Sequence, residues 1–214
     1  MPNGAMPEQN EHYYVAGYSV EDDPYVLPNG VLINSLNLTT TAELGEAEAE
    51  FVPYRTAELW DSPVAGRFDL AHLQEIHRRL FQDIYPWAGQ CRKVDIAKGD
   101  TMFLANGLIL KRADELFAGL AAEKHLQGMD APAFCERSAE YLGKLNFIHP
   151  FREGNGRTQR EFIGQLAREA GFLIDWSGYA PSSMKDACIA AQETNYRPLM
   201  RILLTGIKAF PANQ

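Results

Sequence analysis

The fold of this chain is organised around the loop segment His149-Pro150-Phe151-Arg152-Glu153-Gly154-Asn155-Gly156-Arg157-Thr158-Gln159-Arg160. Apolar residues recur at helical spacing over 132–148 before this segment and over 157–170 after it. The proline cannot continue the first helix in the normal way, and the two glycines give the loop a flexible backbone. The sequence therefore predicts two helices whose ends meet at one polar loop.

Helical patterns cover most of the remaining chain. They are expected over Ala42–Leu59, over a segment capped by Asp69 in which Leu70, Leu73, Ile76 and Leu80 recur, and over Ile109–Lys124, Pro181–Glu193 and Pro198–Ile207. Pro53 is expected to interrupt the first of these helices or to end its first half. Between 90 and 106, short apolar clusters flank Gly99-Asp100, which predicts a β-hairpin with its turn there. The predicted fold class is all-α, a bundle of roughly seven helices with one small β-hairpin.

Composition and charge exclude several classes of function. The net charge is −8 over 214 residues and no run of Lys and Arg could follow a phosphate backbone, so direct binding to nucleic acid is not expected. No segment approaches the roughly 20 apolar residues that span a bilayer. Three widely spaced cysteines lack metal-ligand spacing and are interpreted as reduced thiols, which favours a cytoplasmic location. Residues 1–12 are polar and are expected to form a disordered tail before a folded domain over 13–214.

The loop segment contains the residue types that phosphate chemistry requires. His149 can accept a proton near neutral pH. The backbone amides of Gly154-Asn155-Gly156 run into a helix N-terminus, where anions are favoured. Glu153 could hold Mg²⁺ between two phosphate groups, and Arg157 and Arg160, three positions apart, could fork onto outer phosphate oxygens. The segment therefore predicts a site that binds a nucleoside triphosphate.

Each of these residues taken singly is more typical of an ordinary turn between helices. The combination of a base, an acid, an anion nest and paired arginines within one loop is not typical of a turn, because a simple turn has no use for these groups. A zinc hydrolase is disfavoured, since His149 and Glu153 do not supply the three or four ligands that such a site needs. His77 lies beside two arginines on a predicted helix face and is more typical of a structural or solvated residue than of a catalytic one.

The same segment fits the signature HxFx(D/E)GNGRxxR at every specified position, and the chain thereby resembles the Fic family over roughly residues 20 to 207. The resemblance implies a Fic-type helical bundle with a hairpin flap. It also implies a protein adenylyltransferase that moves AMP from ATP onto a Ser, Thr or Tyr hydroxyl of a target protein. Further segments are similar to the small bacterial proteins called cell filamentation protein Fic: Asp23-Pro24-Tyr25, Val31–Asn34, Gly66–Leu70, Ile76–Phe81 and Tyr85–Gly89.

Residue roles follow from the resemblance by position. His149 would be the catalytic base and Glu153 would hold Mg²⁺ between the α- and β-phosphates. The flap would pair with an extended stretch of the target, although an ordinary edge hairpin remains an alternative. Tyr196 could stack on the adenine, and a core position is the alternative for it. The expected nucleotide-binding residues are Lys98, Gly99, Arg152, Glu153, Gly154, Asn155, Gly156, Arg157, Thr158, Arg160 and Tyr196.

Many Fic proteins are inhibited by a helix with the motif (S/T)xxxE(G/N). The nearest candidate here, Thr39 to Glu43, is followed by Leu44 where Gly or Asn is required. The resemblance therefore implies a separate small antitoxin whose glutamate would pair with Arg160; an unregulated effector translocated into host cells is the alternative. The implied targets are a subunit of DNA gyrase or topoisomerase IV, or a host small GTPase.

Two other functions remain open. A Fic-fold transferase could use another donor, such as phosphocholine or UMP, or act as a kinase, although Gly156 stands where the kinase motif has Lys. A catalytically silent nucleotide-binding module would keep the anion nest and work through binding alone.

Overall fold

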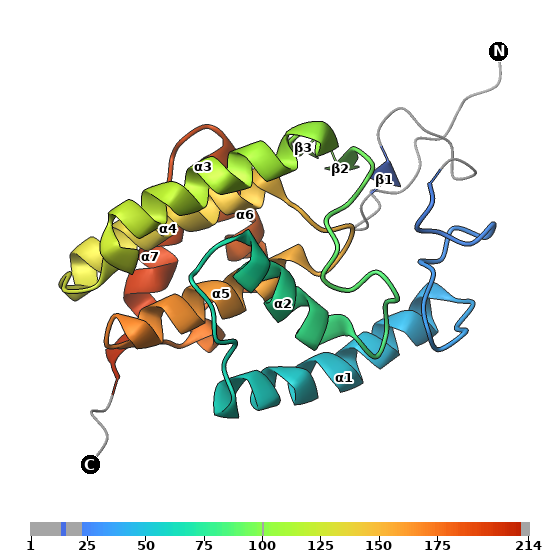
Figure 1. Ribbon diagram of the computed structural model, residues 1–214, viewed down its shortest axis with the longest axis horizontal. Coiled ribbons are helices and arrows are strands. Elements are labelled where there is room, and N and C mark those ends of the chain that lie inside the picture. The colour runs from blue at the N-terminus through green and yellow to red at the C-terminus, as the bar shows by residue number, and fades with distance from the viewer. Residues whose placement is uncertain (1–13, 16–22, 100, 211–214) are drawn as a thin grey trace.

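The computed structural model describes residues 14–15, 23–99 and 101–210 (Figure 1). The tail expected over 1–12 lies outside these residues, as does Asp100 of the expected turn. The helices are α1 (Thr41–Asp61), α2 (Leu70–Phe81), α3 (Ile109–Ala122), α4 (Ala131–Ile148), α5 (Asn155–Glu169), α6 (Pro181–Gln192) and α7 (Arg197–Gly206). The strands are β1 (Tyr14–Val15), β2 (Ile96–Lys98), β3 (Thr101–Met102), β4 (Phe172–Ile174) and β5 (Ile207–Ala209).

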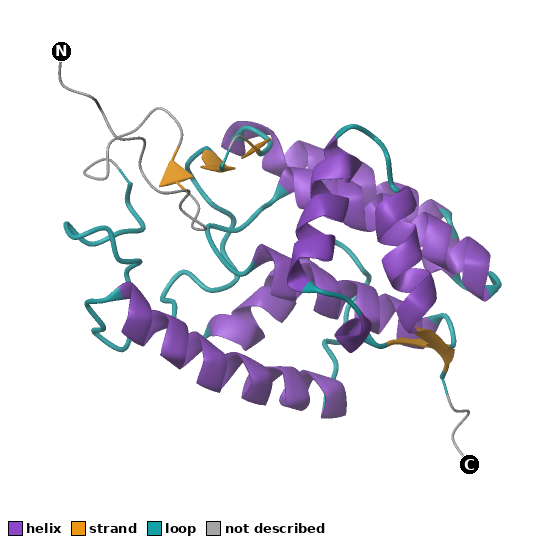
Figure 2. Ribbon diagram, turned by 180° about the vertical axis from the view of Figure 1, so that it is seen from behind, coloured by secondary structure: helices purple, strands orange, loops and turns teal. Residues whose placement is uncertain are grey.

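The architecture confirms the all-α class and the expected hairpin. Strand β2 pairs antiparallel with β3, and β1 pairs with the other edge of β2. A second antiparallel pair, β4 with β5, was not predicted. Helix α5 ends at Glu169, and Gly171, at φ +87°, turns the chain into β4. Strand β5, the partner of β4, follows α7 directly. Figure 2 shows the two small sheets at opposite ends of a molecule that is otherwise mostly helical.

The prediction that Pro53 interrupts the first helix is wrong, because α1 runs unbroken from Thr41 to Asp61. Proline removes one N–H and leaves the carbonyl four residues earlier without its helical partner. That residue is Ala49, and both it and Pro53 are exposed, so water can bond to the carbonyl. A capping box at the start supports the helix, with Thr40 and Glu43 each bonding the backbone of the other.

The core forms where α5 lies between α2 and α4 (Figure 1). On α2, Leu73, Ile76 and Leu80 are buried as their spacing predicts, and Asp69 caps the helix by accepting from the His72 amide at 2.9 Å. Helix α4 packs on α3, α5, α6 and α7. The loop between α4 and α5 is thereby fixed at the centre of the bundle.

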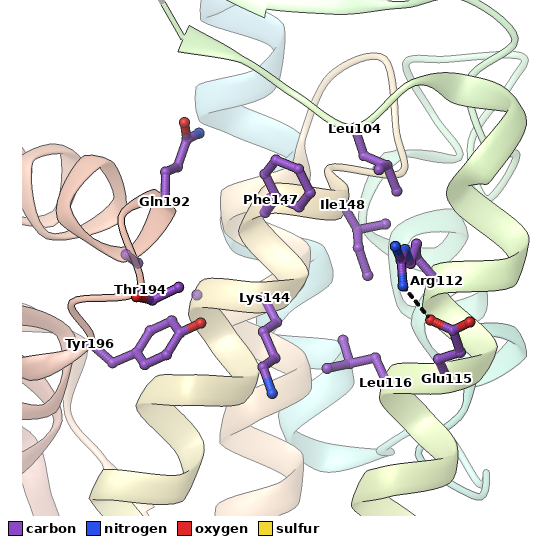
Figure 3. Close-up of a pocket in the computed structure, with 12 residues that line it drawn as sticks. Leu104, Arg112, Glu115, Leu116, Lys144, Phe147, Ile148, Gln192, Thr194 and Tyr196 are labelled. Atoms are coloured by element: carbon purple, nitrogen blue, oxygen red, sulfur yellow. Dashed lines mark hydrogen bonds and ion pairs between the residues drawn. The ribbon is translucent and has the colours of Figure 1, made fainter.

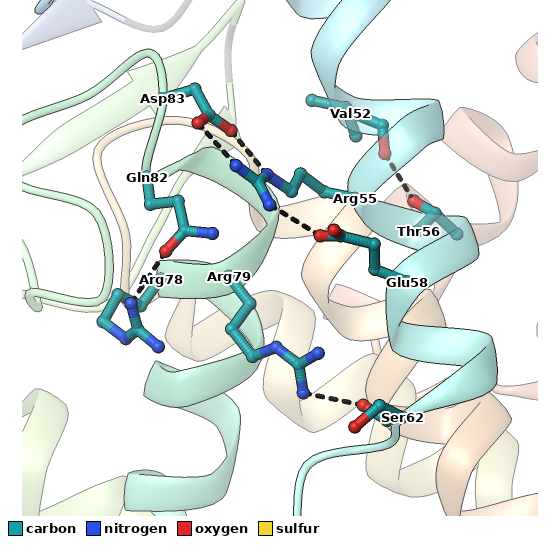
Figure 4. A network of polar contacts seen from close by, with 9 residues as sticks. All are labelled: Val52, Arg55, Thr56, Glu58, Ser62, Arg78, Arg79, Gln82 and Asp83. Atoms are coloured by element: carbon teal, nitrogen blue, oxygen red, sulfur yellow. Dashed lines mark hydrogen bonds and ion pairs between the residues drawn. The ribbon is translucent and has the colours of Figure 1, made fainter.

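Polar contacts hold α1 on the end of α2 (Figure 4). Arg55 donates to both carboxylate oxygens of Asp83 at 2.6 Å and to Glu58 at 2.6 Å. Arg79 donates to the Ser62 carbonyl at 2.7 Å, just past the end of α1. These contacts fix the register of α1 against α2. Within the described ranges, no helix is both long enough and apolar enough to cross a membrane.

Candidate active site

The loop of residues 149–154 is shaped by two residues in the left-handed region. His149, at φ +48°, is the C-cap of α4, and its amide donates to the Leu145 carbonyl at 3.0 Å. Gly154, at φ +78°, is the N-cap of α5. A Cβ at Gly154 would lie 2.4 Å from the Phe81 ring, so only glycine fits there. Helix α5 begins at Asn155, two residues earlier than predicted, which brings Gly156 into its first turn.

Two predicted nucleotide-binding residues use their side chains inside the loop. Asn155 accepts from the Phe151 amide at 2.9 Å and donates to the Phe151 carbonyl at 2.8 Å. The Thr158 hydroxyl donates to the Gly154 carbonyl at 2.9 Å. The first helical hydrogen bond of α5 runs from the Thr158 amide to Gly154. The amides of residues 155–157 therefore precede the hydrogen-bonded ladder and point out of the helix N-terminus, where an anion is favoured.

The local structure fixes the tautomer of His149. Its Nδ1 lies 2.8 Å from the Asn146 carbonyl oxygen, which can only accept, so Nδ1 carries the proton and Nε2 the lone pair. The Phe103 ring, just beyond β3, stacks on the imidazole at 3.7 Å between centroids. Burial lowers the pKa of His149 to about 3, so the imidazole is neutral at physiological pH. A neutral imidazole with a defined Nε2 lone pair has the properties of a general base.

Arg92, which sequence reasoning missed, ties this loop to the flap. Its buried guanidinium donates to the carbonyls of His149 at 2.8 Å and Val94 at 2.6 Å, and also to that of Leu104. Its amide donates to the Pro150 carbonyl at 2.8 Å. Nothing in the sequence distinguishes this arginine from a solvated one, because its partners are carbonyls on three separate segments.

Arg152 forms a buried ion pair with Asp23, 2.8 Å between Nη2 and Oδ2. The two residues are 129 positions apart, and Asp23 also accepts from the Tyr25 amide at 3.0 Å. The pair fastens the N-terminal segment to the loop. Arg152 was predicted to bind nucleotide; this contact favours instead a part in holding the loop in shape.

Arg157 and Arg160, both in the first two turns of α5, reach different surroundings. Arg157 pairs with Glu48 of α1 at 2.9 Å and lies 3.5 Å from Glu153. Arg160 crosses above Gly156, where its Nη1 would be 3.3 Å from an added Cβ. Among the described residues, no carboxylate lies within salt-bridge distance of Arg160. That both arginines bind outer phosphate oxygens stays a prediction; Arg157 is already paired with carboxylates, so Arg160 is the better placed to take a phosphate.

Glu153 presents its carboxylate at the N-terminus of α5. Its Oε1 accepts from the Gly154 amide at 2.8 Å. Burial raises the pKa of Glu153, while the Gly154 N–H and the charges of Arg157 and Lys98 act in the opposite direction. A half-buried carboxylate beside amides and a lysine has the character of a ligand for one hard cation.

The flap brings Lys98 close to the loop. Lys98 ends β2 and is followed by Gly99, at φ +56°, in the expected turn. The positive charge of Lys98 contributes to lowering the pKa of His149 and opposes the rise at Glu153. Two segments separated by about fifty residues thus share one electrostatic environment. The nucleotide-binding parts predicted for Lys98 and Gly99 stay predictions.

Tyr196 lines a separate pocket of about 570 Å³ over α4 (Figure 3). The pocket also contains Leu104 and Phe147, which neighbour the flap and the loop along the chain. The Tyr196 ring packs so closely on Gly143 that an added Cβ there would lie 2.7 Å away. His149 is not among the pocket's lining residues. The close packing favours the core interpretation of Tyr196, and the pocket leaves one side of the ring available.

His77 is a structural residue, as the sequence indicated. It is buried, its Nδ1 accepts from the Gly89 amide at 2.8 Å, and its Nε2 donates to the Glu153 carbonyl at 3.0 Å. Its ring stacks on Phe151 at 3.9 Å between centroids. His77 therefore holds the loop in place through its contacts with Glu153 and Phe151.

Three buried histidines predict a loss of stability in mild acid. Burial lowers the pKa of His72, and lowers those of His77 and His149 to about 3. The unfolded chain binds protons near pH 6.5, which the folded chain does not, so stability is complete above that pH and falls as the pH drops through it towards 3. We expect a loss of about 1 kcal/mol at pH 5.5 for each of His77 and His149. Urea unfolding at pH 8, 7, 6 and 5.5 measures it; a free energy of unfolding that stays level down to pH 5.5 would contradict it.

Comparison with known proteins agrees with this site. A sequence profile of the Fic/DOC family matches residues 67–167, which include the whole loop. The chain is 41% identical over 198 residues to the protein adenylyltransferase VbhT of Bartonella schoenbuchensis, covering 92% of this chain and 41% of VbhT. It is 39% identical over 166 residues to the "Probable protein adenylyltransferase Fic" of Escherichia coli K12, covering 77% of this chain and 82% of that protein.

Solved structures share the fold. BepC, a VirB-translocated effector from Bartonella tribocorum with bound AMPPNP, has a TM-score of 0.79 at 27% identity and covers 86% of this chain and 96% of its own. The Fic domain of a VirB-translocated effector from Bartonella quintana with bound ADP has a TM-score of 0.80 at 29% identity, with coverage of 86% and 94%. Both structures hold an adenine nucleotide.

Proposed function

We propose, from the premise that this chain belongs to the Fic/DOC family and is a protein adenylyltransferase, that it transfers AMP from ATP to a Ser, Thr or Tyr hydroxyl of a target protein with His149 as the base. One observation carries the proposal: the neutral imidazole of His149 and the outward-pointing amides of α5 belong to one short, braced loop. We also infer that residues 13–214 form the Fic domain, since α1 to α7 share one core.

The reaction would proceed by in-line displacement. His149 Nε2 takes the proton of the target hydroxyl as its oxygen attacks the α-phosphorus, the bond to the β-phosphate oxygen breaks, and pyrophosphate leaves. The amides of residues 155–157 and the guanidinium of Arg160 would stabilise the phosphate charge. Since the α5 amides are fixed by the helix before substrate binds, most of the rate enhancement would come from positioning and electrostatics.

Mg²⁺ would enter with the nucleotide. Over the described ranges, no cluster of three or more His, Cys, Asp and Glu side chains could hold a metal. Mg²⁺ often binds one carboxylate and completes its shell with water and substrate phosphates. Glu153 at the helix N-terminus fits that arrangement, and the ion would neutralise phosphate charge there.

Adenine is the base we propose for the donor. Two similar structures contain AMPPNP or ADP, which favours ATP over UTP or a phosphocholine donor for this chain. Tyr196 could contact the base from its pocket. Lys98 and Gly99 would border the nucleotide, and the edge of the flap would take the target segment.

The target and the regulation are a further part of the proposal. The relatives include translocated Bartonella effectors, which supports a host protein such as a small GTPase as target. The match to the Escherichia coli protein supports a bacterial target such as a gyrase or topoisomerase IV subunit, with the chain staying in the cytoplasm. Arg160, without a carboxylate partner among the described residues, would accept the glutamate of a separate small antitoxin.

Labelling distinguishes the possible reactions. The protein is incubated with Mg²⁺ and bacterial or host lysate, once with α-³²P-ATP and once with γ-³²P-ATP. We expect label on a protein band from the α position alone, and mass spectrometry then names the modified residue. Label from the γ position would indicate a kinase. No label from either would exclude ATP as donor to the proteins supplied and favour another donor or the silent binding module.

A further inference from the structure

Glu48 lies on α1, 109 positions before the loop arginine with which it pairs. Its Oε2 accepts from Arg157 Nη1 at 2.9 Å, and its Oε1 accepts from the Tyr85 hydroxyl at 2.5 Å. Both carboxylate oxygens are thus used, and both carboxylate and guanidinium are mostly buried. In this environment a charged hydrogen bond is stronger than on the surface.

Two carboxylates share the Arg157 guanidinium. Glu48 is at 2.9 Å, while Glu153 Oε1 is at 3.5 Å from the other terminal nitrogen. The guanidinium also lies over the Phe81 ring, 4.7 Å from its centroid. Arg157 is therefore held closer to the helix α1 side than to the carboxylate of the loop.

Removal of the Glu48 charge would change the position of the Arg157 guanidinium between the two carboxylates. Guanidinium groups form close, bidentate pairs with carboxylates, and Glu153 would be the remaining carboxylate within reach. Arg157 would then close on Glu153 and occupy the oxygens that a cation needs. The contact with Glu48 competes directly with that closure.

We infer that Glu48 is a positioning residue that holds Arg157 away from Glu153 and so keeps the Glu153 carboxylate open to the Mg²⁺ of the bound nucleotide. The inference rests on the proposed function, in which Glu153 holds that ion. Glu48 would act through Arg157, to which it is bonded.

Glu48 has its own supports, so its place does not depend on Arg157. The Tyr85 ring stacks on Trp87 at 4.3 Å between centroids, which fixes the hydroxyl that donates to Glu48. Helix α1 is held on α2 by the bidentate contact of Arg55 with Asp83 (Figure 4). These contacts hold the Glu48 carboxylate in place next to Arg157.

The test is Glu48→Gln, which keeps the shape and removes the charge. Isothermal titration with a non-hydrolysable ATP analogue, with and without Mg²⁺, measures how much the ion strengthens binding. We expect that gain to fall about tenfold in the variant, as for the loss of one charged hydrogen bond. The Mg²⁺ concentration for half-maximal AMP transfer should rise by a similar factor, and saturating Mg²⁺ should restore most of kcat.

Two further variants separate positioning from fold stability. Leu203→Ala opens a cavity in the core at α7 and changes neither α1 nor Glu48, so it should lower the melting temperature while leaving the Mg²⁺ dependence as in wild type. Glu48→Asp keeps the charge and should recover most of the Mg²⁺ effect. Equal Mg²⁺ dependence in Glu48→Gln and Leu203→Ala would overturn the inference. Wild-type binding that does not respond to Mg²⁺ would instead overturn the proposed role of Glu153.

Discussion

His149→Ala is expected to lower the rate of AMP transfer by at least about a thousandfold, within the range that a general base contributes. The imidazole is buried, neutral and fixed with its lone pair on Nε2, so the variant loses the one group in the loop suited to take the hydroxyl proton. Nucleotide affinity should stay within about threefold of wild type, because the groups proposed to contact the phosphates, the α5 amides and Arg160, remain in place.

The measurement pairs single-turnover transfer of α-³²P label with titration of a non-hydrolysable ATP analogue. His149→Gln serves as a second variant, since it fills more of the space beneath Phe103 and keeps a polar atom near the Asn146 carbonyl. If both variants bind the analogue and transfer no label, His149 acts in the chemical step. If either retains more than a tenth of the wild-type rate, another group is the base.

Local sequence patterns predicted much of this structure. Helix α2 follows directly from the spacing of Leu73, Ile76 and Leu80 behind the Asp69 cap, because a 3.6-residue period is a strong local signal. The residues of the loop were predictable because they are consecutive. Its proline, its glycines and the helix termini on either side also indicated where the chain turns.

Contacts between distant segments were not predictable. Asp23 with Arg152 and Glu48 with Arg157 are ion pairs that span more than a hundred positions, and a charged residue looks the same in sequence whether it is paired or solvated. The pairing of β4 with β5 was not predictable either, because each strand is three residues long and has no period of its own. These contacts decide which loop side chains are committed to the fold and which remain for a ligand.

Gly154→Ala is the second variant with a large expected effect, here on stability as well as transfer. The residue is at φ +78°, where an alanine costs about 1–2 kcal/mol. Its Cβ would lie 2.4 Å from two atoms of the buried Phe81 ring, and overpacking of a core typically costs a further ~1–3 kcal/mol. The matched control is Gly164→Ala on the same helix, where nothing lies within 4 Å of the added Cβ and the change should be neutral or slightly stabilising.

Phe81 connects that strain to function. Its ring lies under the Arg157 guanidinium and beside the His77 ring, which in turn bonds the Glu153 carbonyl. A displaced ring would therefore move the amides of α5 and the Glu153 carboxylate together, and we expect AMP transfer to fall by more than tenfold at temperatures where the variant is still folded. Adding Phe81→Leu to Gly154→Ala should recover part of the stability, because it removes the clash and leaves only the backbone cost. If the double variant is no more stable than the sum of the two single-variant losses predicts, the destabilisation by Gly154→Ala comes from the backbone conformation and not from the contact with Phe81.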